Sequence, residues 1–402
     1  MRIRSICTSI YCGVFLLVFF VPLYFFNFSG AVSSENRMLA SFPALPKSIE
    51  ETSHFTNDVE IWLNDRIGFR KELTSLYRRI QLSIFGVSPS KIVALGSDGT
   101  AFLLQAQHST DKHSELFEAF GETPGGTSLY TQQIEALSRA SVAFKASTKP
   151  VLMLAVPTSP LFRFKNLPKH VRMTVTPKTP KNHPVSRALV NFTANNKNDF
   201  LHFLHPFQES LDLAKNYTLY PQKNFHWSWS PFTVMVSEMI AEKFGHPITR
   251  RFAPEDFSPC AGRSDLAHLV GINAFINEND LCPSGYFYEG QKISSTSLKD
   301  AFPSPDAVHT TAGTLYKNMA VSSGKLLVIG DSFNFHLGLP LVRNFREVLV
   351  LDYYGTMRET QNNPTPVLRH LRAAYNPDQV VIVRHNLFQD IQGMPEISIF
   401  LQ

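Results

Sequence analysis

The sequence predicts an α/β sandwich with a mainly parallel central sheet, and two observations support this prediction. Short, branched apolar runs alternate along the chain with segments of helical periodicity, which is typical of a sheet covered by helices. The runs are continuously apolar rather than alternating with polar residues, as expected of strands buried on both faces. They span residues 151–157, 326–330, 348–353 and 380–383.

Two helices are predicted among these strands, over residues 130–146 and 231–244. The second has clear boundary residues at both ends. Ser230 is suited to cap its N-terminus, Pro231 fits the first helical position, and Gly245 follows its end.

The N-terminal residues differ in composition from the rest of the chain. Arg2 and Arg4 precede 30 uncharged residues, Ser5 to Ser34. A bilayer core accommodates about 20 apolar residues, so residues 6–26 are predicted to be an uncleaved transmembrane helix. The positive flank predicts a cytoplasmic N-terminus and an exported remainder. A cleaved signal peptide is the alternative.

Three segments are expected along the chain. They are residues 1–34, the membrane anchor (or signal sequence) and start of a linker; residues 35–85, a juxtamembrane linker followed by a helical segment from residue 51; and residues 86–402, the main domain, with a loop-rich insertion at 252–322 packed near the functional site.

Two of the four cysteines, Cys260 and Cys282, lie in the exported part. They are predicted to form a disulfide, which would stabilise the fold by roughly 3 kcal/mol on the chain-entropy model. Two buried free thiols are the alternative. No His/Cys cluster has the spacing of a zinc site, so no metal is predicted.

The net charge of +5 is mild, but the cations are unevenly distributed. No acidic residue occurs between Glu135 and Asp199. Such a stretch favours an anionic partner, while an ordinary solvated basic face is the alternative. In an exported domain that partner would be a charged polysaccharide or a lipid headgroup rather than nucleic acid. The cations of this stretch include Arg163, Lys165, Lys169 and Arg172.

The stretch KLLVIGDSFNFHLG, residues 325–338, places Ser332 directly after an apolar strand. In an open α/β sheet, ligands bind beyond the carboxyl ends of the strands. A helix expected to begin at Ser332 would offer N–H groups to an oxyanion. A nucleophilic serine also needs a base, normally a histidine oriented by a carboxylate. The alternative is a serine that only caps a structural helix.

Three histidines are candidates for that base. His226 precedes the predicted helix at Pro231, and His385 follows another strand end. His309 has Asp306 three residues upstream. The residues alone do not choose among them, because any of the three can be a structural histidine.

Five blocks in a fixed order give these candidates a context. Together they resemble the exported, SGNH-hydrolase-like O-acetyltransferases of alginate and related exopolysaccharides (the AlgJ/AlgX type). The blocks are ENRMLASFPALP (35–46), LNDRIGFRKEL (63–73), FGVSPSKIVALGSDGTAF (85–102), HWSW (226–229) and GDSF (330–333).

This resemblance implies several properties of the chain. It implies an SGNH-hydrolase-like three-layer sandwich, a single-pass anchor in the inner membrane and a catalytic domain in the periplasm. It also implies that no cofactor is needed, because the acyl group arrives from a membrane-bound O-acyltransferase partner.

The resemblance makes Ser332 the nucleophile and His226 the base, but the family's aspartate position holds Asn224. Asparagine can hold an imidazole without supplying negative charge, and this change costs about 10⁴ in the rate of a serine protease. Asn224 therefore indicates a slow enzyme, a triad completed by another acid such as Asp306, or a catalytically lapsed binder. Trp227 and the four cations named above are candidate substrate-binding residues.

The leading hypothesis is a membrane-anchored, extracytoplasmic O-acetyltransferase that modifies a secreted polysaccharide through a serine acyl-enzyme. In this hypothesis His226 deprotonates Ser332 and then the sugar hydroxyl, and Asn224 orients His226. A carbohydrate esterase is the second hypothesis. The third is a non-catalytic polysaccharide-binding or assembly protein, which Asn224 favours.

Overall fold

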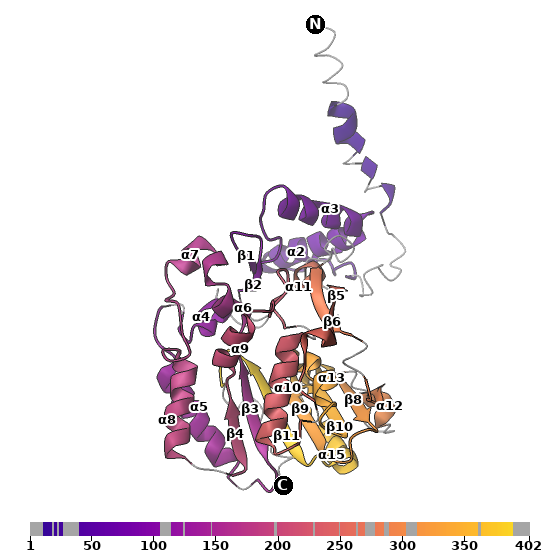
Figure 1. Cartoon of the computed structure of the whole chain (residues 1–402). Coiled ribbons are helices and arrows are strands. Elements are labelled where there is room, and N and C mark those ends of the chain that lie inside the picture. Colours follow the sequence, from indigo (N-terminus) through magenta and orange to yellow (C-terminus); the bar gives the residue numbers. More distant parts are fainter. Residues whose placement is uncertain are drawn as a thin grey trace. The chain divides into compact units, whose positions relative to one another are not determined.

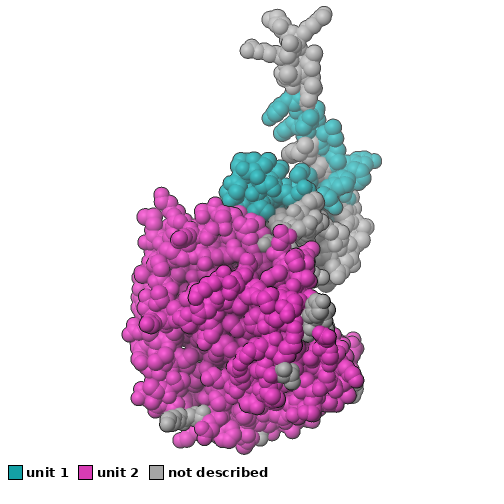
Figure 2. Space-filling view, in the orientation of Figure 1, with its two compact units in different colours: residues 1–89, 270–272 teal, residues 90–269, 273–402 magenta. Residues whose placement is uncertain are grey.

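The computed structural model divides the chain into two compact units, which are described separately (Figure 2). Unit 1 comprises residues 1–89 and 270–272, and unit 2 comprises residues 90–269 and 273–402. This division lies close to the boundary predicted at residues 85 and 86. The structure describes residues 11–17, 20–21, 24–26, 40–104, 114–123, 125–145, 147–196, 199–227, 230–248, 250–262, 264–269, 278–284, 289–302, 312–360 and 363–388.

Unit 1 contains a pair of helices where one helical segment was predicted. Helix α2 spans Ile49–Arg66 and helix α3 spans Arg70–Ser83. The chain breaks between them at Phe69, whose φ of 56° lies in the left-handed region that ends a helix. The family-like block at residues 63–73 covers this break.

The N-terminal transmembrane prediction remains untested. Residues 11–17 are helical, but part of the predicted span at residues 6–26 lies outside the described residues. Within the described part of the chain, no helix is both long enough and apolar enough to cross a bilayer.

Unit 2 is built on a seven-stranded sheet of order β4-β3-β11-β9-β10-β8-β7 (Figure 1). The first five strands in this order are parallel, and β8 and β7 extend the sheet in antiparallel fashion. All four predicted strands are present, so the mainly parallel sheet is confirmed. The strands are β3 (Val151–Val156), β4 (Leu201–Leu204), β7 (Ile293–Ser297), β8 (Gly313–Asn318), β9 (Lys325–Gly330), β10 (Glu347–Asp352) and β11 (Gln379–His385).

Helices cover both faces of this sheet, as the continuous apolar runs predict. The two predicted helices are confirmed as α5 and α10, and the side chain of Ser230 caps α10 by accepting from Phe232 N–H. The α-helices of unit 2 are α4 (Ser114–Ala119), α5 (Tyr130–Ala143), α6 (Ser159–Phe162), α7 (Lys169–Arg172), α8 (Pro184–Asn195), α9 (Phe207–Leu213), α10 (Pro231–Lys243), α11 (Asp265–Leu269), α12 (Leu298–Ala301), α13 (Gly338–Leu341), α14 (Tyr353–Glu359) and α15 (Thr365–Tyr375).

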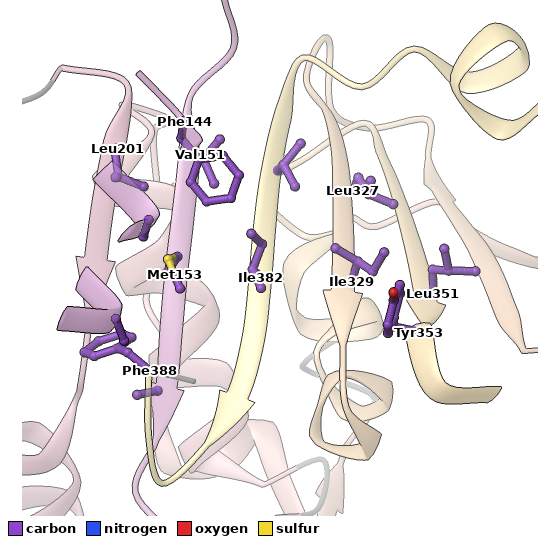
Figure 3. Packing of buried hydrophobic residues seen from close by; sticks show 14 of the residues in the cluster. Phe144, Val151, Met153, Leu201, Leu327, Ile329, Leu351, Tyr353, Ile382 and Phe388 are labelled. Carbon is purple, nitrogen blue, oxygen red and sulfur yellow. The ribbon is translucent and has the colours of Figure 1, made fainter. Parts of the chain in front are cut away.

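Successive side chains of each central strand enter two different cores. In β3, Val151 and Met153 pack on the side of α5, α8 and α15 (Figure 3), whereas Leu152 and Leu154 pack on the side of α10 and α13. Because successive side chains of a strand point to opposite faces, the sheet needs a helical layer on each side. Unit 2 is therefore a three-layer α/β sandwich, as expected.

The stretch at residues 252–322 differs in part from the predicted loop-rich insertion. Its second half supplies β7 and β8 of the main sheet. Its first half contains a small antiparallel hairpin of β5 (Phe257–Gly262) and β6 (Glu278–Pro283). The predicted disulfide between Cys260 and Cys282 is present and joins the two strands of this hairpin.

Candidate active site

Ser332 lies just beyond the carboxyl end of β9, the middle strand of the sheet. Gly330 permits this sharp exit, because a Cβ at that position would lie 2.2 Å from the carbonyl oxygen of Val383 on β11. Ser332 is exposed, whereas the residues on either side of it are buried. A serine at the end of a buried strand is thus presented to solvent, as predicted.

The helix that begins at Ser332 is shorter than expected. It is a 3₁₀ helix, η5 (Ser332–His336), followed by the single-turn α13. Asp331 caps it by accepting the Phe333 N–H at 3.0 Å. That N–H therefore already has an acceptor, and a one-turn helix carries little of the dipole that a long helix would aim at Ser332.

His226 makes a hydrogen bond to the candidate nucleophile. Its Nε2 lies 2.7 Å from Ser332 Oγ, although 106 residues separate the two in sequence. On the other side of the ring, Nδ1 lies 3.0 Å from Oδ2 of Asp265. An ionised carboxylate only accepts hydrogen bonds, so Nδ1 donates and Nε2 accepts the serine proton. This is the tautomer that a general base requires.

Asp265 is the acid in the hydrogen-bonded series Ser332–His226–Asp265, which we call the relay. The sequence did not identify this residue. The same Oδ2 accepts the backbone N–H groups of His226 and Phe225, at 3.0 and 3.1 Å. Burial raises the pKa of the Asp265 carboxyl, but the hydrogen bonds and charge of His226 and these N–H groups leave the pKa lowered overall. Asp265 therefore stays ionised at neutral pH and can stabilise an imidazolium at His226.

Asn224 has a different position from the one expected. Its side-chain oxygen accepts the backbone N–H of Asp265 at 2.7 Å, whereas the carboxylate on His226 Nδ1 belongs to Asp265. Asn224 thus fixes the start of α11, the helix that carries Asp265. The acid on His226 is therefore Asp265 of α11, and the side chain of Asn224 holds the backbone of that residue.

We expect Asn224→Asp to give no gain in acylation rate. The new carboxylate would lie at the backbone N–H of Asp265, close to the Asp265 carboxylate, where like charges repel. A several-fold slower acylation of Ser332 by an activated ester is expected, measured in single-turnover experiments. Asn224→Ser, which keeps a small polar side chain without the charge, is the matched control. A faster Asn224→Asp enzyme would contradict this arrangement.

The other candidates for acid and base have different outcomes. Asp306 and His309 lie outside the described residues. His385 cannot act as the base, because each of its two ring nitrogens contacts a carboxylate. His336, on η5, is a further imidazole near His226, and burial and the His226 charge lower its pKa to about 4. His336 is therefore uncharged at neutral pH.

Trp227 is not a sugar-binding surface. Its side chain is fully buried, and its indole N–H donates to the carbonyl oxygen of Phe333 at 2.7 Å. Trp227 therefore joins the segment that carries His226 to the segment that carries Ser332. The prediction that it contacts substrate is wrong, since the apolar ring serves the core instead.

The four candidate substrate-binding cations fall into two groups. Arg163 is engaged within the fold, donating to Thr100 Oγ1 at 3.1 Å and to the carbonyl oxygen of Tyr220 at 2.5 Å. The other three, Lys165, Lys169 and Arg172, are exposed. They lie on the 3₁₀ helix Phe164–Asn166 and on α7. A role in substrate binding remains a prediction for these three.

A buried charge cluster lies directly behind the nucleophile, and we name Glu115, His385 and Asp331 the carboxylate clamp. His385 Nδ1 lies 2.7 Å from Asp331 Oδ2, and His385 Nε2 lies 2.8 Å from Glu115 Oε2. Both ring nitrogens must donate to such partners, so His385 is an imidazolium. Burial lowers the pKa of His385, but the charges of Glu115 and Asp331 raise it well above the usual value overall.

The carboxylate clamp is connected to Ser332 through Asp331. This residue precedes the nucleophile, accepts the backbone N–H groups of Phe333 and His385, and binds the His385 ring. The ring of Phe333 stacks on that of His385, with centroids 5.2 Å apart. The clamp therefore fixes the backbone on both sides of Ser332.

The Cys260–Cys282 disulfide closes the loop that carries Asp265. The bridge joins β5 to β6 across a separation of 22 residues, and α11 lies between them. An acid between the two cysteines of the predicted disulfide, at the start of a helix, is the sequence signal that could have suggested Asp265. Ser264 supports that start, since its hydroxyl accepts the Ala267 N–H at 3.1 Å.

We expect the double variant Cys260→Ser, Cys282→Ser to lose about 3 kcal/mol of unfolding free energy by loop entropy. Acylation of Ser332 should also slow at temperatures where the variant is fully folded, because Asp265 is held less firmly. Denaturant titration measures the first effect and single-turnover acylation the second. An unchanged rate in the folded variant would show that Asn224 and the backbone contacts suffice to hold Asp265.

Within the described part of the chain, no cluster of three or more His, Cys, Asp or Glu side chains is arranged to hold a metal ion. The candidate site itself consists of three side-chain groups, those of Ser332, His226 and Asp265. These are an exposed serine hydroxyl, an imidazole of the correct tautomer and an ionised carboxylate.

The solved structures that are similar to this chain have low sequence identities and TM-scores below 0.5. No protein-family model matches the chain, and no curated protein matches it significantly. A Bacillus cereus PatB1 structure with a sulfonyl adduct is similar at 13% identity and a TM-score of 0.45, covering 74% of this chain and 94% of that one.

Two further similar structures come from Pseudomonas. The O-acetyltransferase domain of Pseudomonas putida AlgJ has 13% identity and a TM-score of 0.37, covering 77% of this chain and 98% of that one. Pseudomonas aeruginosa AlgX has 10% identity and a TM-score of 0.35, covering 77% of this chain and 68% of that one.

Proposed function

We propose that the chain is an extracytoplasmic O-acetyltransferase that modifies a secreted polysaccharide through an acyl-enzyme on Ser332. The observation that supports this proposal is the hydrogen-bonded series Ser332 Oγ, His226 and Asp265. This arrangement activates a serine for acyl transfer. The choice of acetyl and of a polysaccharide rests on the resemblance of the five sequence blocks.

In the first half-reaction Ser332 Oγ attacks the acyl carbonyl of the donor while His226 Nε2 takes the serine proton. The charge of Asp265 stabilises the imidazolium so formed. The tetrahedral adduct then collapses, and the donor's leaving group departs with the proton from His226. Ser332 is left as an ester, and His226 is neutral again.

In the second half-reaction a sugar hydroxyl takes the place of the leaving group. His226 Nε2 removes its proton as the oxygen attacks the ester carbonyl, and the proton then returns to Ser332 Oγ as the product departs. The exposed cations Lys165, Lys169 and Arg172 would favour an anionic polysaccharide. In this proposal the donor is a membrane-bound O-acyltransferase, and an uncleaved N-terminal anchor in the inner membrane holds the periplasmic site near it.

Two alternatives share this fold. An esterase would use the same relay with water in place of the sugar hydroxyl. A non-catalytic binder was favoured by Asn224, and the carboxylate of Asp265 on His226 supports the catalytic hypotheses instead.

The test uses the full chain in detergent with an activated acetyl ester, with and without oligosaccharide. We expect acetyl on Ser332 by mass spectrometry, transfer of that label to the sugar, and no label in Ser332→Ala. Release of the label only to water would make the chain an esterase. The absence of label from Ser332 in the wild-type chain would contradict both enzyme hypotheses.

A further inference from the structure

Helix α3 of unit 1 exposes a row of large apolar side chains, which we name the apolar stripe. Their spacing places them on a single helix face. Contiguous exposed apolar patches that are bordered by polar residues generally mark an interaction surface. The stripe consists of Phe69, Leu73, Leu76, Tyr77, Ile80 and Ile84, whose exposed fractions are 44, 40, 51, 61, 36 and 71%.

The rest of α3 is strongly basic. Four cations and one anion, Glu72, give the helix a net charge of +3. By helical spacing, Arg78 lies opposite the apolar stripe, and Arg70 and Arg79 lie nearer its borders. Basic side chains beside an apolar face can reach headgroups while their methylene stems stay on the apolar side. The cations are Arg70, Lys71, Arg78 and Arg79.

The apolar stripe continues into the uncharged N-terminal segment of the same unit. The ring of Phe25 packs edge-on against Phe69, the first residue of the stripe, with centroids 4.8 Å apart. Phe26 packs similarly near Trp62 of α2, at 5.5 Å. Side chains of the N-terminal segment are themselves exposed and apolar, among them Val14, Phe15, Leu16, Leu17 and Phe20.

We propose that α3 is a membrane-surface helix, which lies in the headgroup region of an anionic bilayer with its apolar stripe inserted. The charge balance of α3 complements anionic headgroups, and an amphipathic helix with cations on its polar side is the usual form of such a contact. Continuity with an uncharged, exposed apolar segment favours a lipid surface over a protein partner. This inference goes beyond the proposed function, since it concerns α3 and does not depend on Ser332 chemistry.

The test places an environment-sensitive fluorophore on the full chain, reconstituted into phosphatidylcholine vesicles with and without phosphatidylglycerol. Cys7 and Cys12 are replaced by serine, and the disulfide of unit 2 is retained. One reporter is Leu76→Cys, in the apolar stripe. The matched control is Ser75→Cys, the adjacent residue, which helical spacing places on the other side of α3.

We expect spin-labelled lipids to quench the label at residue 76 several-fold more than the label at residue 75. The difference should be larger with phosphatidylglycerol present. Equal quenching at the two positions overturns the inference, as does a difference that phosphatidylglycerol does not change. None of these readouts depends on acyl transfer.

Discussion

Replacing Asp265 by asparagine is expected to slow acylation of Ser332 by about 10⁴-fold, as the corresponding change does in a serine protease. An asparagine oxygen can still accept the backbone N–H groups of Phe225 and His226, so the local fold should persist. The amide carries no charge to stabilise the imidazolium, and its NH₂ can hold His226 in the wrong tautomer. Single-turnover acylation by an activated acetyl ester measures the loss.

Two comparisons make this prediction specific. The thermal transition of Asp265→Asn should stay near that of the wild type. Asn224→Ala should lower acylation only modestly, because the Asn224 side chain accepts the backbone N–H of Asp265 and supplies no charge to His226. The lowered pKa of Asp265 implies that its carboxylate stays ionised at mildly acidic pH. A wild-type rate in Asp265→Asn would mean that His226 has another acid, and the relay described here would be wrong.

Replacing His385 by glutamine is expected to lower the free energy of unfolding by about 3–5 kcal/mol at neutral pH. The side chains of Glu115 and Asp331 are each only 7% exposed, and both lie within hydrogen-bond distance of the His385 ring. Without the imidazolium, two buried carboxylates face each other with no counter-charge. Denaturant titration of both proteins over a range of pH measures the loss.

The pH dependence distinguishes this charge effect from lost packing. The pKa of His385 is raised in the folded state, so its contribution is complete below the ordinary histidine pKa of about 6.5 and is lost as pH rises through the folded value. The wild type should show this alkaline loss, and His385→Gln should not. The variant should recover stability on acidification, as its carboxylates take up a proton. Parallel pH profiles of the two proteins would exclude a charged clamp.

We also expect His385→Gln to slow the acylation of Ser332. Asp331 holds the N–H of Phe333 and precedes Ser332, so loosening the clamp should also slow acylation where the protein is folded. Tyr375→Phe is a suitable control. Its hydroxyl is buried and bonded to the Leu326 carbonyl of β9, at the strand end away from Ser332. It should lower stability without altering the pH profile described above.

The sequence predicted the parallel part of the fold well and its edges poorly. The four strands that it identified are buried on both faces and so appear as continuous apolar runs. Strands β4, β7 and β8 were not predicted. The sequence ISSTS of β7, for example, is polar and mostly exposed at the sheet edge. Pairing with a neighbour, rather than local pattern, makes such a segment a strand.

For the candidate site, the sequence with its family resemblance predicted Ser332 as the nucleophile and His226 as the base. Ser332 follows a buried strand, and His226 matches a block in a family-like order; neither conclusion needs coordinates. Only the tertiary structure decided the acid and the roles of Asn224, Trp227 and His385. The reason is physical: a hydrogen bond joins atoms within about 3 Å irrespective of sequence separation. Asp265 lies 39 residues from His226, between the two cysteines of a disulfide, and the sequence alone does not pair the two side chains.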